Sequence, residues 1–139
     1  IEIGKRYNLE KMAERPDLGS SLAIYNFIHP KVRDLEVEEA HLLLMNQNFR
    51  LIKHVKLSVG GITETAVDVR RIMREAVLNN ATILALSHNH PSNSPKPSRA
   101  DDTLTHQIKA ACDLMRIFFM DHVIVADGSF YSYHDKGKL

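Results

Sequence analysis

The chain has 139 residues, of which 44% are hydrophobic and 25% are charged, a composition typical of one soluble domain with its own core. Its 18 basic and 17 acidic residues give a formal net charge of +1, so bulk charge indicates neither a nucleic-acid nor a membrane partner. The single cysteine, Cys112, excludes an internal disulfide and a zinc site built from cysteines, and it fits a reducing compartment.

The N-terminal part of the chain gives the weakest structural signal. Residues 1–11 lack the apolar core of a signal peptide, and no stretch of the chain approaches the roughly 20 apolar residues that span a bilayer. We therefore expect a cytoplasmic protein with no membrane partner. Residues 1–34 are expected to form a short helical lead-in. Ser20 or Ser21 can cap its helix, and Pro30 is expected to end it because the residue before proline avoids the helical region. The expected apolar face consists of Leu22, Tyr25, Phe27 and Ile28.

A hairpin and a helix are predicted next. The apolar run "AHLLLMN" and the loosely alternating "QNFRLIKHVKLSVGG" flank a polar Asn-Gln-Asn turn, which predicts a β-hairpin that ends at Gly60-Gly61. Asp68 can cap the helix that follows. The apolar stripe of this helix consists of Val69, Ile72, Met73, Ala76 and Val77.

The second half of the chain alternates strand and helix. "ATILALSHNH" predicts a central strand, and the loop "PSNSPKPS" contains three prolines and no regular structure. Ser98 begins another helix, whose apolar face consists of Leu104, Ile108, Ala111, Cys112 and Met115. "FFMDHVIVA" and "FYSYH" flank Asp127-Gly128-Ser129, a strong hairpin signal. The order helix, hairpin, helix, strand, helix, hairpin indicates a mixed α/β domain over residues 35–139.

The end of the predicted central strand carries a possible metal site. Side chains two apart on a strand point the same way, so His88 and His90 can offer two corners of a tetrahedral zinc site. Asp101, in the first turn of the next helix, is the candidate third ligand. Such a set leaves a fourth position open, as in catalytic sites, where bound water has its pKa lowered toward about 7. A bare His-x-His is usually incidental, however, and Ser98 and Asp101 also imitate a helix-capping pattern.

The stretch as a whole follows the pattern H-x-H-x(7)-S-x(2)-D, which resembles the motif of JAMM (MPN+, JAB) metalloproteases. The segments "SHNHPS", "KPSRADD" and "MDHVIVADGSFYSY" are similar to the bacterial RadC family, whose members are named as DNA repair proteins. The resemblance covers about residues 20–139. It implies a cytidine-deaminase-like (JAB/MPN) fold, a three-layer α/β sandwich around a mixed β-sheet. It also implies a Zn²⁺ site made by His88, His90 and Asp101.

The resemblance further implies a general base just before the first core strand. RadC sequences usually place this acid eight residues before the Asp or Asn that ends the strand, and counting back from Asn46 gives Glu38. Glu39 is the rival, but neighbouring side chains point to opposite faces, so only one of the two can reach the metal. The implied mechanism is similar to that of thermolysin. Glu38 takes the proton of a metal-activated water, and Ser98 donates a hydrogen bond to the developing oxyanion, unless it only caps the helix.

Some features depart from the family or have simpler explanations. RadC proteins commonly show Gly at the position of Asn93, although Asn tolerates the left-handed conformation. Many also carry an upstream helix-hairpin-helix segment, whereas only a short helix precedes the domain here, so we expect a fragment or a short relative. His122 is expected to be a hydrogen-bonded strand histidine, with a supporting role behind the metal as the alternative. Cys112 is expected to be a core residue. The remaining histidines show no ligand spacing: His29, His41, His54, His106 and His134.

The leading hypothesis is therefore a JAMM-type zinc metallohydrolase that cleaves a peptide or isopeptide bond. The alternative is a DNA-repair-associated accessory or DNA-binding module with a structural or inherited metal site. It is motivated by the RadC name and by a modest basic patch, for which a solvated surface is the simpler explanation. The patch consists of Lys53, Lys56, Arg70, Arg71 and Arg74. A protein-binding domain without metal or DNA affinity is a third hypothesis.

Overall fold

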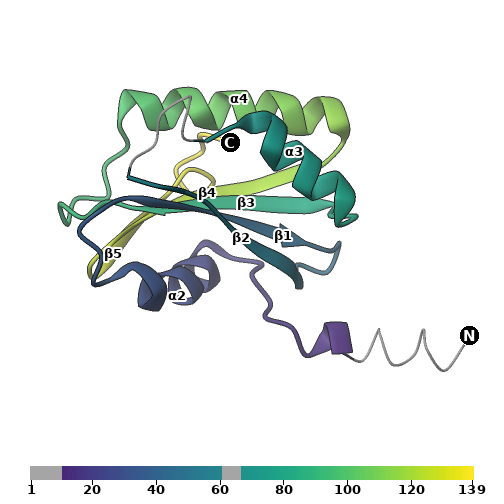
Figure 1. Ribbon diagram of the computed structural model, residues 1–139, viewed down its shortest axis with the longest axis horizontal. Coiled ribbons are helices and arrows are strands. Elements are labelled where there is room, and N and C mark those ends of the chain that lie inside the picture. The colour runs from purple at the N-terminus through teal and green to yellow at the C-terminus, as the bar shows by residue number, and fades with distance from the viewer. Residues whose placement is uncertain (1–10, 61–66) are drawn as a thin grey trace, which may run out of the picture.

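A computed structural model of the chain describes residues 11–60 and 67–139 (Figure 1). The first ten residues of the predicted lead-in and Gly61 of the predicted hairpin end lie outside the described residues. The helices are α2 (Ser21–Val32), α3 (Val69–Leu78) and α4 (Arg99–Met115). The strands are β1 (Glu39–Met45), β2 (Leu51–Val59), β3 (Ile83–Asn89), β4 (Phe118–Ala126) and β5 (Ser129–Ser132). No helix within the described residues is both long and apolar enough to cross a membrane.

Within residues 11–60 and 67–139, the sheet has five strands in the order β2-β1-β3-β4-β5, with β3 at its centre. Only β3 and β4 are parallel, since α4 carries the chain back between them, and the other neighbours are antiparallel. Helices α3 and α4 cover one face and α2 covers the other, which makes three layers (Figure 1). The α/β sandwich with a mixed sheet that the resemblance implied is confirmed.

Each face of the sheet has its own apolar core, which explains why β1 and β3 are buried along their whole length. On β1, Leu42 and Leu44 pack toward α3 and α4, whereas Leu43 and Met45 pack toward α2. The same alternation places His88 of β3 on the α4 face, because Ala40 and His88 are register partners. This face carries the candidate site.

Helix α2 is capped by Ser20, whose side chain accepts a hydrogen bond from the Ala23 N–H. The prediction that Pro30 ends the helix is wrong, since the helix continues through Pro30 to Val32. Proline removes one backbone donor, but its usual acceptor would be the carbonyl of the exposed Asn26, and the following turn buries Val32 in the core. The division of the chain after residue 34 stays a prediction.

The expected apolar faces of the helices are partly wrong. The buried positions of α2 are Ile24, Ile28 and Val32, whereas Leu22 is 55% exposed. On the other two helices, Val77 and Met115 lie at the edge of their stripes and are 52% and 47% exposed. The buried positions thus repeat with the expected helical spacing, but the buried face of each helix is shifted or narrower than the face predicted from the sequence. Sequence spacing alone does not determine which part of an apolar stripe is buried.

Both hairpins are confirmed. The β1–β2 turn is held by Asn46, whose side-chain oxygen accepts hydrogen bonds from the N–H groups of Asn48 (2.9 Å) and Arg50 (3.1 Å). The β4–β5 turn uses Gly128 with φ 79°, a left-handed conformation that glycine adopts at little cost. Cys112 is fully buried on α4, as predicted, and burial raises the pKa of its thiol to about 12.

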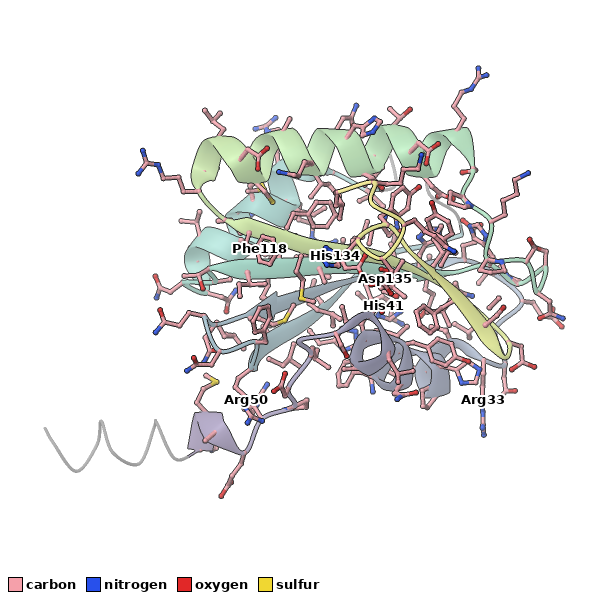
Figure 2. The ribbon with its side chains drawn as sticks, turned by 180° about the vertical axis from the view of Figure 1, so that it is seen from behind. Arg33, His41, Arg50, Phe118, His134 and Asp135 are labelled. Atoms are coloured by element: carbon pink, nitrogen blue, oxygen red, sulfur yellow. The ribbon has the colours of Figure 1, made fainter. Side chains whose placement is uncertain are left out.

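The C-terminal turn is fastened to the sheet by Asp121, a buried carboxylate on β4. It accepts hydrogen bonds from Ser132 Oγ (2.6 Å) and from the His134 N–H (3.0 Å). Asp135 accepts a further hydrogen bond from Ser21 Oγ at the start of α2, and Figure 2 shows the labelled His134 and Asp135 in this turn. The intervening Tyr133 is thereby held in the interior, where it stacks on His122.

Candidate metal centre

His88 and His90 lie at the carboxyl end of the central strand. His88 is within β3, and His90 continues the extended chain because its N–H donates to the Val125 carbonyl of β4 at 2.8 Å. Their Nε2 atoms are 3.0 Å apart, so the two side chains point to the same side, as strand alternation predicts. Asn93 in the loop that follows has φ 65°, so the left-handed turn expected for it is confirmed.

Asp101 reaches the histidines from the first turn of α4. Ser98 caps this helix: its Oγ accepts the Asp101 N–H at 3.1 Å, and Asp101 Oδ2 accepts the Ser98 N–H at 2.8 Å. This reciprocal pair is a capping box, formed with Asp where Glu or Gln is commoner. The capping interpretation of Ser98 is therefore correct, and the cap also fixes the direction of the Asp101 carboxylate.

The three candidate ligands converge with spacings that suit a metal. Asp101 Oδ1 lies 3.1 Å from His88 Nε2, and Asp101 Oδ2 lies 3.3 Å from His90 Nε2. Ligand atoms about 2.0–2.2 Å from a tetrahedral zinc ion would be roughly 3.3–3.5 Å apart. Each histidine nitrogen is thus within a few tenths of an ångström of this spacing from one Asp101 oxygen, and one ligand atom from each of the three residues lies within 4.8 Å of the other two. Among the His, Cys, Asp and Glu side chains of the described residues, these three form the group that could hold a metal ion.

The charges at this point favour an anionic carboxylate. Burial alone would raise the pKa of Asp101, but hydrogen bonds with His88 and His90 outweigh burial and lower it far below its usual value. The same contact with Asp101 raises the pKa of His90 against the opposing effect of burial. Asp101 is therefore anionic, as a metal ligand must be, and a cation bound here would displace the proton that Asp101 favours on His90.

Glu38 and Glu39 point to opposite faces of the sheet. Glu38 Oε1 lies 3.9 Å from His90 Nε2, on the α4 face. Glu39 Oε1 lies 3.1 Å from His41 Nε2, on the α2 face, and its other oxygen lies 3.5 Å from Lys56 Nζ. Of the two acids that the sequence left in competition, the structure brings only Glu38 to the candidate ligands.

The position of Glu38 depends on Asn89, which sequence reasoning passed over. Its side-chain oxygen accepts the Glu39 N–H at 2.7 Å, and its amide donates to the Val37 carbonyl at 3.0 Å. These two bonds clamp the backbone on both sides of Glu38. The signal for this role was present in the sequence, since Asn89 is the middle residue of the His-x-His motif and had to point away from the metal.

Exposure increases across the site in one direction. The side chain of His88 is fully buried and that of Asp101 is 2% exposed, whereas His90 and Glu38 are 11% and 30% exposed. A ligand in the fourth position would therefore meet solvent on the side of His90 and Glu38. An open fourth position is the feature that distinguishes catalytic metal sites in general from closed structural ones.

The family model of the RadC-like JAB domain matches residues 18–138. The chain belongs to this family. It is similar to a UPF0758 protein of Porphyromonas gingivalis, with 38% identity over 140 residues that cover 100% of this chain and 62% of that protein. A UPF0758 protein of Flavobacterium johnsoniae is 35% identical over 137 residues, 99% of this chain and 60% of that protein. The chain thus spans about three fifths of the length of these relatives.

Behind the ligands of this RadC-like domain lies a second layer of polar side chains. His122 Nε2 is 2.8 Å from His88 Nδ1, and His122 Nδ1 is 2.6 Å from Thr105 Oγ1. The His122 ring is fully buried and parallel to that of Tyr133, with centroids 4.9 Å apart. Burial lowers the pKa of His122 well below its ordinary value, so the ring is neutral. The expectation that His122 is a hydrogen-bonded strand histidine is confirmed, and its supporting role behind a metal stays a prediction.

The opposite face of the RadC-like domain contains a second histidine pair that the sequence did not indicate. His41 Nδ1 lies 2.7 Å from His54 Nε2, and the edge of the Phe27 ring of α2 packs against His54. Burial lowers the pKa of His41 and lowers that of His54 to about 4. Cross-strand neighbours on β1 and β2 bring these residues together, which their separation in sequence concealed.

The predicted basic patch is partly paired with neighbouring groups. Lys53 Nζ lies 3.2 Å from Glu75 Oε2, and Arg71 donates to the Leu57 carbonyl at 3.0 Å. With Lys56 beside Glu39, three of its five cations have partners within the domain. The structure therefore adds no support to this patch as a phosphate-binding surface.

Proposed function

We propose that this RadC-like JAB domain is a zinc-dependent hydrolase that cleaves a peptide or isopeptide bond. One observation carries the proposal. The Nε2 atoms of His88 and His90 lie 3.0 Å apart and each lies 3.1–3.3 Å from one of the two Asp101 carboxylate oxygens, with the Glu38 carboxylate 3.9 Å from His90. Metal ligands, an open side and an adjacent acid are together what hydrolysis by activated water requires.

The donor set supports zinc as the ion. Two imidazole nitrogens and one carboxylate oxygen are a ligand set of catalytic zinc sites, whereas magnesium and calcium prefer oxygen ligands throughout. A divalent ion held there would supply Lewis acidity, by lowering the pKa of bound water toward about 7 and polarising the scissile carbonyl.

Glu38 is the residue that would move protons. Its carboxyl group stands at the solvent side of the ligands, where it can accept a proton from water. The same carboxyl group can then protonate the leaving amine, which completes amide hydrolysis. The Asn89 clamp keeps Glu38 at this distance without contacting the reacting atoms itself.

Ser98 can serve both as helix cap and as donor to the oxyanion. In the cap its Oγ acts as an acceptor for the Asp101 N–H. A serine hydroxyl also has one hydrogen to donate, and the cap does not use it. The developing oxyanion of the substrate would accept that hydrogen, so the two roles assigned to Ser98 are compatible in a single conformation.

The test is hydrolysis of a panel of peptide and isopeptide substrates by zinc-loaded protein, with Glu39→Gln as the matched control for Glu38→Gln. Loss of the general base should lower the rate by about 10²–10⁴-fold while zinc still binds. Glu39→Gln, on the opposite face, should keep wild-type activity. Zinc-loaded protein that is inert on every amide tried, or Glu38→Gln as active as the wild type, would contradict the proposal.

Binding to DNA stays a prediction. Its test is duplex binding that weakens steeply with salt and survives His88→Ala, since phosphate contacts do not need the metal site. Duplex binding of this kind would support an accessory role, and its absence at low salt would exclude one for this domain.

A further inference from the structure

The hydrogen-bond chain behind His88 carries an inference that rests on the proposed metal site and deepens it. We infer that Thr105 and His122 are positioning residues, which hold His88 with its Nδ1 protonated and its Nε2 free to bind the metal. Thr105, His122 and His88 are all fully buried, so none of the three side chains contacts bulk solvent. Their separations are 2.6 Å and 2.8 Å.

The direction of the chain follows from counting hydrogens. The Thr105 hydroxyl has a single hydrogen, and it donates to the Asp101 carbonyl one helical turn earlier, at 2.7 Å. If this hydrogen pointed at His122 instead, two bare oxygen atoms would face each other at that distance. Thr105 Oγ1 must therefore accept a hydrogen bond from His122 Nδ1–H.

The next two links are then fixed. His122 is fully buried and its ring nitrogens contact no carboxylate within the described residues, so a second ring proton would have no counter-charge and the single proton lies on Nδ1. Its bare Nε2 must accept from His88 Nδ1–H, because two lone pairs would otherwise face each other at 2.8 Å. This leaves His88 Nε2, the atom 3.1 Å from Asp101 Oδ1, as the nitrogen available to a metal, which would replace the hydrogen that this atom shares with Asp101 in the metal-free protein.

His90 is oriented in the same way by a different partner. Its Nδ1 lies 2.9 Å from the Ser94 carbonyl, which can only accept, so this nitrogen carries a hydrogen. Both histidines are thus anchored through Nδ1 and present Nε2 to the same point. The partly exposed His90 is held by a backbone carbonyl. The buried His88 is held by the His122 and Thr105 side chains, which end in a hydrogen bond to the backbone of α4. Partners of this kind typically change metal affinity by about 10–100-fold.

The first experiment measures Zn²⁺ affinity of the purified chain by competition with a chromogenic chelator. Thr105→Val keeps the shape but removes the hydroxyl, and it should bind Zn²⁺ about 10–100-fold more weakly. Thr105→Ser restores the hydroxyl and should return affinity to near the wild-type value. Ile108→Val, one turn further along α4, is the control for a small core defect and should leave affinity unchanged. Thr105→Val with wild-type affinity would overturn the inference.

The second experiment reads the ring protons of metal-free wild-type protein by long-range ¹H–¹⁵N NMR, so it needs neither a variant nor a bound ion. We expect His122 to be protonated at Nδ1 and bare at Nε2, which is the less common tautomer of free histidine. His122 protonated at Nε2 would overturn it. If the wild type bound no Zn²⁺, the proposed function would fail, while this spectrum would still decide the direction of the chain.

Discussion

Replacing Ser98 by alanine separates the two roles of this residue, because loss of the helix cap affects stability and loss of the oxyanion donor affects the rate of hydrolysis. Ser98→Ala removes the Oγ that accepts the Asp101 N–H, but the reciprocal bond from the Ser98 N–H to Asp101 Oδ2 uses the backbone and survives. Loss of such a cap costs about 1 kcal/mol of unfolding free energy. For a domain of this size, this lowers the melting temperature by about 3 °C. Because Asp101 keeps one tether, zinc should still bind.

The effect on hydrolysis should be much larger than the effect on stability. Removing one oxyanion donor typically lowers kcat by about 10²–10³-fold. Thermal unfolding followed by circular dichroism and hydrolysis of a substrate found with the wild type measure the two effects in the same samples. Ser98→Thr, which keeps a hydroxyl, should recover most of both. A kcat reduced less than about tenfold would refute the donor role, since that corresponds to only about 1.4 kcal/mol.

Three other predictions follow from the described contacts. Burial lowers the pKa of His54 to about 4, so the unfolded chain binds more protons than the folded protein between about pH 4 and 6.5. The free energy of unfolding should therefore rise as the pH is raised through that range and fall as it is lowered, by at most about 3 kcal/mol. Denaturant unfolding at several pH values should show a flatter profile for His54→Gln; an unchanged profile would contradict this reasoning. Asn89→Ala removes the two hydrogen bonds that hold the backbone on both sides of Glu38. In urea unfolding it should be about 2 kcal/mol less stable than the wild type, and it should lose most hydrolytic activity. Wild-type activity in this variant would argue against the clamp. Cys112 is fully buried with a raised pKa, so a thiol reagent should label it only at the rate of unfolding, and rapid labelling of native protein would show that the α4 core opens.

Elements with strong local signals were predictable from the sequence. The turn at Asn46, the Ser98 cap and the Asp127-Gly128 turn depend on interactions within a few residues, and each is present in the structure. Pro30 was misjudged because the local rule for proline competes with burial of Val32 one half-turn later, and only the tertiary structure shows which effect is larger.

The candidate site divides in the same way. His88, His90 and Asp101 are set by strand alternation and by the first turn of a capped helix, which are properties of the sequence pattern. The choice between Glu38 and Glu39 required the register of β1 against β3, and the place of His122 required the parallel pairing of β3 with β4. Thr105 was missed because a buried threonine has no signal of its own in a helix of this composition.

The proposed function depends on a zinc ion bound by His88, His90 and Asp101. Diffraction from crystals grown with Zn²⁺, recorded above and below the zinc absorption edge, would locate that ion directly. The account predicts one anomalous peak about 2.0–2.2 Å from His88 Nε2, His90 Nε2 and an Asp101 oxygen, with a water in the fourth position facing Glu38. Well-ordered crystals with no peak there at saturating zinc, or a peak on the Nδ1 atoms, would contradict it.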